Sequence, residues 1–214
     1  MNQAEAFLLD QVPMVTRSLI PTTLKTAYSA AVAHVQETPF LNVPSAKDNC
    51  GRIIAWAVDF GFQKLIESGQ WSADYRWQPF ASPTGRYLEI ILSHSVVTIS
   101  QVCNSSKQPR DVKFRKNKRL NNQGCLDIAG FCSENKIIGL PHILLLHGHR
   151  TLNFAHLGVP NESHTEGFIY KTANLMLMPH EVPITHEAPV EDTDYDSVMT
   201  LKEEIDRWRK DNGA

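Results

Sequence analysis

The spacing of apolar residues predicts helices in the first third of the chain. Apolar side chains at residues 4–8 predict a short first helix that ends near Pro13. Pro21 is a residue favoured in the first turn of a helix, and apolar positions then recur every three or four residues, so residues 21–37 form a second predicted helix. The same period over residues 53–65 predicts a third helix.

The pattern after residue 70 changes to short β-rich runs separated by turn residues. Residues 71–85 are rich in aromatic residues and contain two prolines, which favours an irregular aromatic loop. Residues 107–123 are polar and predict a basic loop. Runs of β-branched and aromatic residues predict strands, the first two of them paired as a hairpin, at 86–92, 95–102, 143–146, 152–157, 167–170 and 174–178.

Helical periods that come before strand runs predict an α+β fold, in which N-terminal helices pack on a mostly antiparallel sheet. Residues 1–178 form the predicted single domain. Residues 179–195 contain Pro179, Pro183 and Pro189 and several acids, which is typical of a linker. Residues 196–214 follow as a C-terminal amphipathic helix, tethered to the domain by that linker.

Composition narrows the class of protein without naming a function. The chain has 214 residues, a net charge of −2 and 42% hydrophobic residues, which is ordinary for a globular protein. The near-neutral charge gives no whole-molecule argument for binding nucleic acid or a membrane. No stretch approaches the ~18 apolar residues of a membrane span, and the four cysteines lack any CxxC spacing. We therefore expect reduced thiols and a cytoplasmic protein that does not bind a membrane.

The predicted basic loop is the first candidate binding site. Seven cations and one acid give residues 107–119 a local charge of +6, and several Asn and Gln side chains follow. Fixed positive charge beside polar donors is the chemistry that contacts phosphate, and Phe114 offers a ring for base stacking. The alternative is a solvated loop, or one that neutralises the acidic residues 181–214. The candidate nucleic-acid-binding residues are Lys107, Arg110, Lys113, Arg115, Lys116, Lys118 and Arg119. Four of them, Lys113, Arg115, Lys118 and Arg119, are expected to lie exposed on one surface.

The C-terminal helix is the second candidate binding element. Its apolar residues Val198, Leu201, Ile205 and Trp208 alternate spacings of three and four, which makes a narrow stripe on one face. An isolated helix of this length is marginal in water, so the stripe must be covered by its own domain, a second copy or another protein. We predict association with a protein partner or a second copy through these four residues.

The histidines suggest one candidate metal site. His147 and His149 have the spacing that places two side chains on one face of a strand, and His156 on the next predicted strand supplies a third imidazole. No carboxylate stands at a fixed offset to complete a known site. The residues predicted to bind a divalent metal, if one is bound, are therefore His147, His149 and His156; no other cofactor is expected.

Three partial catalytic motifs carry less weight. His180-Glu181 and His186-Glu187 do not extend to the HExxH zinc motif. Arg150 and His156 match the Arg-x5-His spacing of HEPN-type ribonucleases, although the surrounding sequence favours a strand over the helix of that family. Glu89 followed by Asp111-Val112-Lys113 resembles the acid, acid-x-Lys pattern of restriction-type nucleases, yet the second acid lies outside the following strand.

The sequence does not decide whether the protein is an enzyme. The favoured hypothesis is a non-enzymatic interaction protein that binds nucleic acid through the basic loop and a protein partner through the C-terminal helix, such as an antitoxin or phage-defence accessory component. The alternative hypothesis is a metal-dependent phosphodiesterase or nuclease that uses the histidine-rich half. A purely structural subunit is the third.

Overall fold

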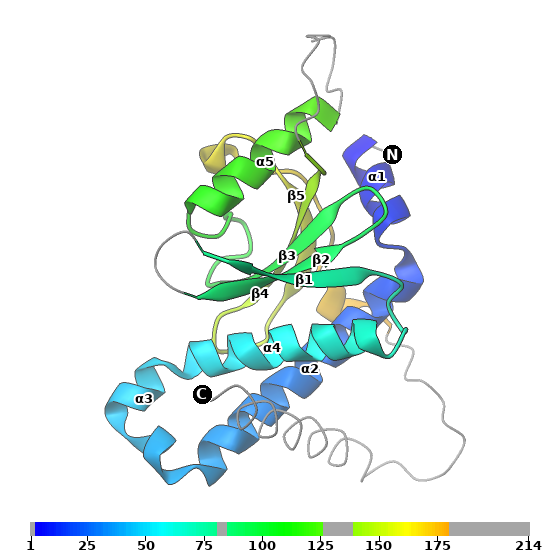
Figure 1. Ribbon diagram of the computed structural model, residues 1–214. Helices are drawn as coiled ribbons and strands as arrows, with labels where there is room; N and C mark the ends of the chain where they lie inside the picture. Colours follow the sequence, from blue (N-terminus) through cyan, green and yellow to red (C-terminus); the bar gives the residue numbers. More distant parts are fainter. Residues whose placement is uncertain (1–2, 81–84, 126–138, 180–214) are drawn as a thin grey trace, which may run out of the picture.

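The computed structural model describes residues 3–80, 85–125 and 139–179, and these segments form three layers (Figure 1). Two long helices, α2 (Met14–Glu37) and α4 (Cys50–Glu67), pack on one another and on one face of a six-stranded sheet. Helix α5 (Lys113–Cys125) covers the other face. The shorter helical elements are α1 (Gln3–Gln11), η1 (Pro39–Asn42), α3 (Pro44–Asp48), η2 (His164–Glu166) and η3 (Leu175–Leu177). This confirms the predicted α+β class.

The sheet is mostly antiparallel, as predicted, with one parallel pair at its centre. Its strands lie side by side in chain order: β1 (Asp74–Pro79), β2 (Arg86–Ile91), β3 (Val96–Val102), β4 (His142–Gly148), β5 (Ala155–Pro160) and β6 (Phe168–Lys171). Strands β3 and β4 run parallel, and every other neighbouring pair is antiparallel. The hairpin of β2 and β3 has the predicted pairing. Two parallel neighbours need a long crossover connection between them, and helix α5 lies on that crossover.

The main core lies between the sheet and helices α1, α2 and α4. Alternate residues of the strands, such as Ile90, Val97 and Leu145, point to this side, where they meet Leu24 and Phe62 of the two long helices. All five side chains are fully buried. A period of two in the strands and of about 3.6 in the helices therefore produces one apolar layer.

Helix α2 differs from the sequence prediction because Pro21 lies inside it. Proline lacks the N–H group that would bond to the carbonyl of residue 17, and we therefore predicted a break before it. The helix instead runs unbroken from Met14, and Ile20 and Leu24 on either side of Pro21 are completely buried. Packing of this apolar face outweighs the lost hydrogen bond.

Three other predicted elements were wrong. Residues 74–79 are a strand rather than part of an irregular loop: Tyr75 and Trp77 alternate with polar residues and bond to Glu67 and Gln63 of α4. Residues 175–177 form a turn of 3-10 helix, η3, and not a strand. The predicted basic loop contains helix α5, which the sequence did not reveal because the helix has no apolar stripe. None of the helices in the described segments is long and apolar enough to cross a membrane.

Replacing a central core leucine tests this packing. Leu145 of β4 is completely buried, whereas Leu177 of η3 is 82% exposed. We expect Leu145→Ala to lower the free energy of unfolding by about 2–5 kcal/mol through lost burial and a residual cavity. Leu177→Ala is the matched control and should change it by less than about 0.5 kcal/mol in denaturant titrations. Equal losses in the two variants would contradict the assigned core.

Candidate nucleic-acid interface

The sheet face opposite the main core is polar beneath α5. Glu89 of β2 and Thr98 of β3 are register partners, and Ser100 follows Thr98 on the same side. His142 of β4 lies beside them, with its Nε2 atom 2.8 Å from the Thr98 hydroxyl oxygen. All four residues are buried. A helix that packs on this face must therefore offer polar side chains, because buried polar groups need hydrogen-bond partners.

The inner side of α5 meets that requirement. The Lys118 ammonium contacts one carboxylate oxygen of Glu89, and the Arg76 Nε atom of β1 donates to the other at 2.6 Å. Arg115 donates to the Ser100 hydroxyl at 3.0 Å. Farther along the helix, the Asn122 side chain donates to the carbonyls of His142 and Pro160 and accepts from the His142 amide. Helix α5 is thus fixed by ion pairs and hydrogen bonds rather than by an apolar stripe.

Arg119 joins the helix to the loop that precedes it. Its two terminal nitrogens lie 2.9 and 3.2 Å from the carboxylate oxygens of Asp111, a bidentate pair. Its Nε atom donates to the Glu162 carbonyl at 2.7 Å. Three of the five N–H groups of the Arg119 guanidinium are therefore bound within the protein, and with 5% of the residue exposed its position is structural rather than open to a phosphate.

Burial and nearby charges lower the pKa values of three groups in this layer. Burial alone would raise the pKa of Glu89, but hydrogen bonds and charge from Lys118 and Arg76 outweigh it and hold the pKa below its usual range. Burial lowers the pKa of Arg115 to about 10. Burial, with the nearby charges of Lys118 and Arg115, lowers the pKa of His142 to about 3. At neutral pH the layer therefore holds an ionised Glu89 and a neutral His142.

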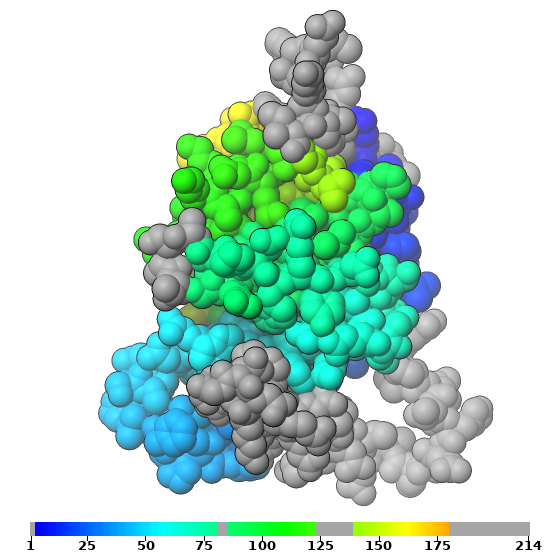
Figure 2. Space-filling model, in the orientation of Figure 1, coloured from blue at the N-terminus to red at the C-terminus, as the bar shows by residue number. Residues whose placement is uncertain are grey.

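The outer side of α5 carries the cations that are free of such contacts. Lys107 and Arg110 in the preceding loop and Lys113 and Lys116 on the helix are exposed, and none forms an ion pair with another described residue. In the space-filling view α5 (green) lies at the surface (Figure 2). We call Lys107, Arg110, Lys113 and Lys116 the outer cations.

The seven predicted nucleic-acid-binding residues therefore divide between two environments. Lys113 lies exposed, as predicted, and so do the other three outer cations. Exposure was wrongly predicted for Arg119, which is 5% exposed, and Lys118 and Arg115 are only partly exposed and point inward to Glu89 and Ser100. A helix can place cations on two sides, a division that a count of charge along the sequence cannot show.

The aromatic ring predicted for base stacking already has a stacking partner. Phe114 stacks on Tyr87 of β2 with ring centroids 4.3 Å apart, and Phe80 tilts against both rings. The Arg115 guanidinium lies over the Phe114 ring, 4.9 Å from its centroid. Phe114 is therefore part of a half-buried cluster that supports the first turn of α5.

The three histidines predicted to bind a metal do not converge. His147 of β4 pairs with Ala155, and His156 of β5 pairs with Leu146, so the two imidazoles lie on opposite faces of the sheet. His149 follows the end of β4 and lies beside Gly51, where an added Cβ would come 2.8 Å from its ring. In the described segments, no three His, Cys, Asp or Glu residues gather as a metal site would require.

Each of the two strand histidines has a hydrogen-bonding role. The Tyr28 hydroxyl of α2 donates to the Gly148 carbonyl, and its oxygen lies 2.7 Å from His147 Nδ1. Since a hydroxyl has one hydrogen, Nδ1 is the donor in the second bond, and burial lowers the pKa of His147 to about 4. His156 Nδ1 lies 2.9 Å from the Thr172 carbonyl, to which it donates. Both bonds join the sheet to neighbouring segments.

The two nuclease-like patterns are not assembled either. Asp111 pairs with Arg119, whereas Glu89 pairs with Arg76 and Lys118, so the two carboxylates do not share a site. Arg150 lies in a bend with a positive φ of 64° and donates to the Asp48 carbonyl, while His156 lies on a strand. Neither arrangement offers the convergent groups that hydrolysis needs.

Sequence reasoning noticed Glu89 but assigned it the wrong partners. The visible signal was a single acid within an otherwise apolar strand run, residues 88–91. A charge in such a run is buried, and a buried charge must be paired, which directs attention to nearby cations. The four apolar residues of the C-terminal stripe, Val198, Leu201, Ile205 and Trp208, lie outside the described residues, so their association stays a prediction.

Comparison with known proteins adds no assignment: no protein family, curated protein or solved structure matches this chain.

Removing Lys118 tests the pairing that fixes α5. Lys118→Met leaves the buried Glu89 carboxylate with Arg76 alone, and we expect unfolding to become easier by about 3 kcal/mol, as for other broken buried pairs. Lys116→Met removes an exposed charge from the same helix and should have an effect below about 0.5 kcal/mol. Adding Glu89→Gln to Lys118→Met removes the unpaired charge. The free energy of unfolding of the double variant should therefore fall by less than the sum of the losses in the two single variants. Strict additivity in denaturant titrations would argue against the pair.

Acidification tests the buried, neutral His142. Its Nδ1 atom has no hydrogen-bond partner among the described residues, so protonation would leave a buried charge uncompensated. The folded pKa of about 3 lies below the ordinary 6.5, so the unfolded chain takes up the proton first and stability is lost as pH falls below about 6.5. His142→Gln keeps a side chain that can bond to Thr98 but does not titrate.

The difference in unfolding free energy between the wild type and His142→Gln isolates this residue, because the other titrating groups contribute equally to both proteins. Between pH 7 and pH 5 the wild type should lose about 2 kcal/mol relative to His142→Gln, since one pKa unit corresponds to about 1.4 kcal/mol. Denaturant titrations at several pH values measure the difference. A difference that does not change with pH would show that His142 titrates normally in the folded protein.

Proposed function

We propose that this protein binds nucleic acid without catalysis, with the phosphate backbone lying along the outer cations. The observation that carries the proposal is four exposed cations, on one short segment, none of which forms an ion pair with a described residue. Phosphate contacts of this kind position a nucleic acid and do not read its sequence.

The position of these cations on the helix supports the proposal. Two of the outer cations, Lys113 and Lys116, lie in the first turn of α5, which contains no acid. The amino end of a helix carries partial positive charge, so cations there destabilise the helix by about 0.3–1 kcal/mol each. Helix stability therefore does not explain them. An anion bound at this end would interact favourably with both the cations and the helix dipole.

The inner layer supports the proposal by keeping α5 in place. Glu89, Asp111 and Ser100 already bind Lys118, Arg119 and Arg115, so a ligand on the outer side need not reorganise the helix. A preorganised surface loses less conformational entropy on binding than a flexible basic loop would. Association through the C-terminal helix stays a sequence prediction and is independent of this proposal. No observation favours the phosphodiesterase alternative, because the described histidines and carboxylates do not converge.

The salt dependence of binding tests this proposal. The affinity for mixed-sequence duplex DNA, single-stranded DNA and RNA should fall steeply as salt rises. Four phosphate contacts on duplex DNA predict a slope of log K against log salt of about −3 to −4. Each single replacement of an outer cation by Ala should flatten the slope by about one unit, with the same loss for every sequence.

A charge-matched pair of variants separates a defined interface from a general charge effect. Lys107→Ala with Lys113→Ala removes two outer cations, and Lys25→Ala with Lys47→Ala removes two exposed cations from α2 and α3. Only the first variant should weaken binding in fluorescence anisotropy titrations. Unchanged binding after replacement of all four outer cations would eliminate the proposal, and equal weakening in both pairs would show unspecific attraction.

A further inference from the structure

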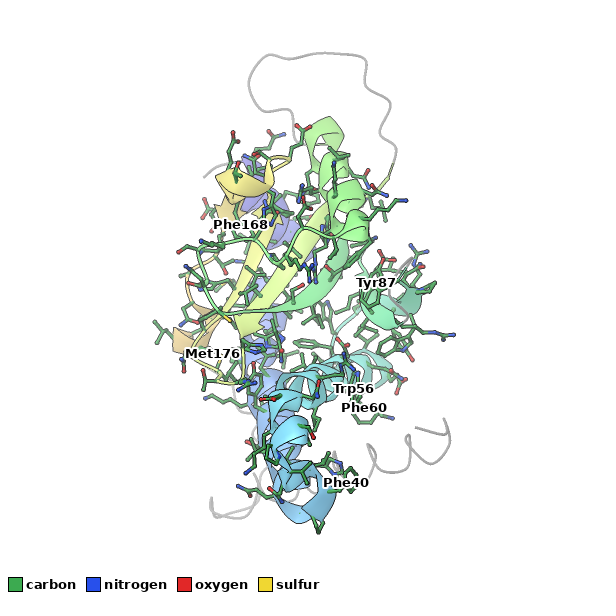
Figure 3. The ribbon with its side chains drawn as sticks, turned by 90° about the vertical axis from the view of Figure 1, so that its left-hand side faces the viewer. Phe40, Trp56, Phe60, Tyr87, Phe168 and Met176 are labelled. Carbon is green, nitrogen blue, oxygen red and sulfur yellow. The ribbon has the colours of Figure 1, made fainter. Side chains whose placement is uncertain are left out.

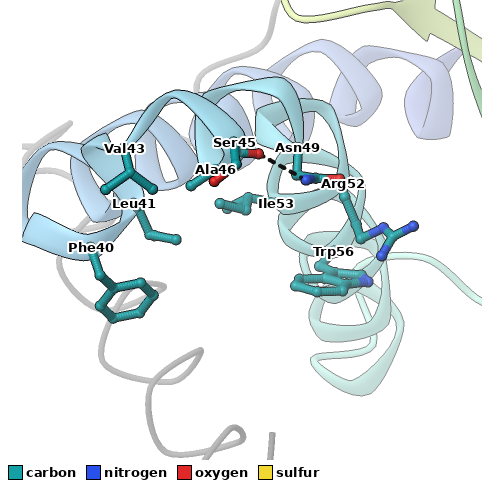
Figure 4. A pocket seen from close by; sticks show the side chains of 9 residues that line it. All are labelled: Phe40, Leu41, Val43, Ser45, Ala46, Asn49, Arg52, Ile53 and Trp56. Atoms are coloured by element: carbon teal, nitrogen blue, oxygen red, sulfur yellow. Dashed lines mark hydrogen bonds between the residues drawn. The ribbon is translucent and has the colours of Figure 1, made fainter.

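An exposed apolar groove opens at the end of the helical layer, away from α5. Phe40 and Leu41 of η1 form one wall, and Ile53 and Trp56 of α4 form the other (Figure 4). Phe40 is 63% exposed and Trp56 is 55% exposed. Phe40 and Trp56 also lie on the same side of the helical layer in the side-chain view (Figure 3). Large apolar side chains gathered in this way on a surface indicate a binding site.

We propose that this groove binds the C-terminal segment of the same chain, residues 196–210, through Val198, Leu201, Ile205 and Trp208. The sequence predicts an amphipathic helix there, with its four apolar residues on a single narrow stripe. A stripe of this shape fits an apolar groove between two helical walls, the arrangement of a helix-in-groove complex. The groove needs an apolar cover, and the stripe needs an apolar surface.

The place where the described chain ends favours this occupant. Leu175 of η3 is buried in the core shared with α2, so the chain leaves the described part on the helical side of the sheet, which also carries the groove. Sixteen residues, 180–195, separate this end from the segment. An extended chain spans up to about 3.5 Å per residue, so this linker reaches about 55 Å. Helix α2, with 24 residues, is only about 36 Å long.

The tether also favours the chain's own segment over a second copy. A short flexible linker gives an effective concentration of about 1 mM at the groove, far above that of a free partner at micromolar concentration. The polar edges of the groove agree with the segment as well. Arg52 lies exposed at the rim, and Glu204 stands at the edge of the predicted stripe, where it can face a cation. The sequence alone favoured association with another chain, and the groove supplies a nearer surface.

Hydrogen exchange of the full-length chain tests the assignment. The backbone amides of residues 198–208 should exchange at least about tenfold more slowly in the protein than in a synthetic peptide of residues 196–210. Phe40→Ser with Trp56→Ser changes two exposed groove residues and should return these amides to the rate of the peptide. Val15→Ser replaces an exposed apolar residue of α2 and should leave the protection intact.

The reciprocal variant examines the groove from the other side. Leu201→Ser with Ile205→Ser should speed the exchange of amides in η1 and α3 while the rest of the described chain keeps its rates. The protection should be independent of protein concentration between about 1 and 100 µM, with light scattering giving the mass of a monomer.

Three results would overturn the proposal. If residues 198–208 of the wild type exchange as fast as the peptide, the segment does not bind the groove. Protection that survives Phe40→Ser with Trp56→Ser would place the segment elsewhere. Protection that rises with concentration together with the mass would show that the segment of a second copy fills the groove.

Discussion

The buried carboxylate of Glu89 is the constraint on which the arrangement of this protein depends. An ionised group with no exposed surface, in the middle of a sheet, is unstable unless cations meet both its oxygens, and Arg76 and Lys118 do so from β1 and α5. The pair therefore determines which side of α5 faces the sheet. Once Lys118, Arg115 and Asn122 are turned inward, Lys113 and Lys116 are necessarily turned outward. A single acid in a strand thus separates the structural cations from those available to a ligand.

Hydrophobic periodicity predicted those parts of the fold whose buried faces are apolar. Helix α4 and the pairing of β2 with β3 followed from such patterns. Ile54 and Phe62 repeat at the helical period, whereas Leu88 and Ile90 of β2, like Val97 and Ile99 of β3, repeat at the period of a strand. Helix α5 was missed for the opposite reason: its buried face consists of Arg119, Asn122 and partly Lys118, which sequence reading assigns to solvent. The break expected at Pro21 failed because long-range packing of α2 outweighs one missing hydrogen bond.

The candidate site was predictable in composition but not in geometry. The local charge located the correct segment, yet it could not distinguish Lys113, which faces solvent, from Arg119, which is bound to Asp111. The histidine prediction relied on a strand continuing through His149, but β4 ends at Gly148. His147 and His156 lie on adjacent strands, and their register places them on opposite faces. Strand ends and register depend on tertiary contacts, and a single sequence does not contain that information.

The parallel seam between β3 and β4 divides the sheet into two meanders of three strands, each built from neighbouring segments. The seam itself joins residues more than forty positions apart, through a crossover that contains α5. Closing a flexible connection becomes harder only with the logarithm of its length, by about 0.6 kcal/mol for each doubling. A residue inserted within a strand of either meander would shift its register and turn its buried side chains to the other face, whereas an insertion in the crossover outside α5 would leave every strand pairing unchanged. Within this architecture, the crossover is the place where the chain has room to acquire new sequence.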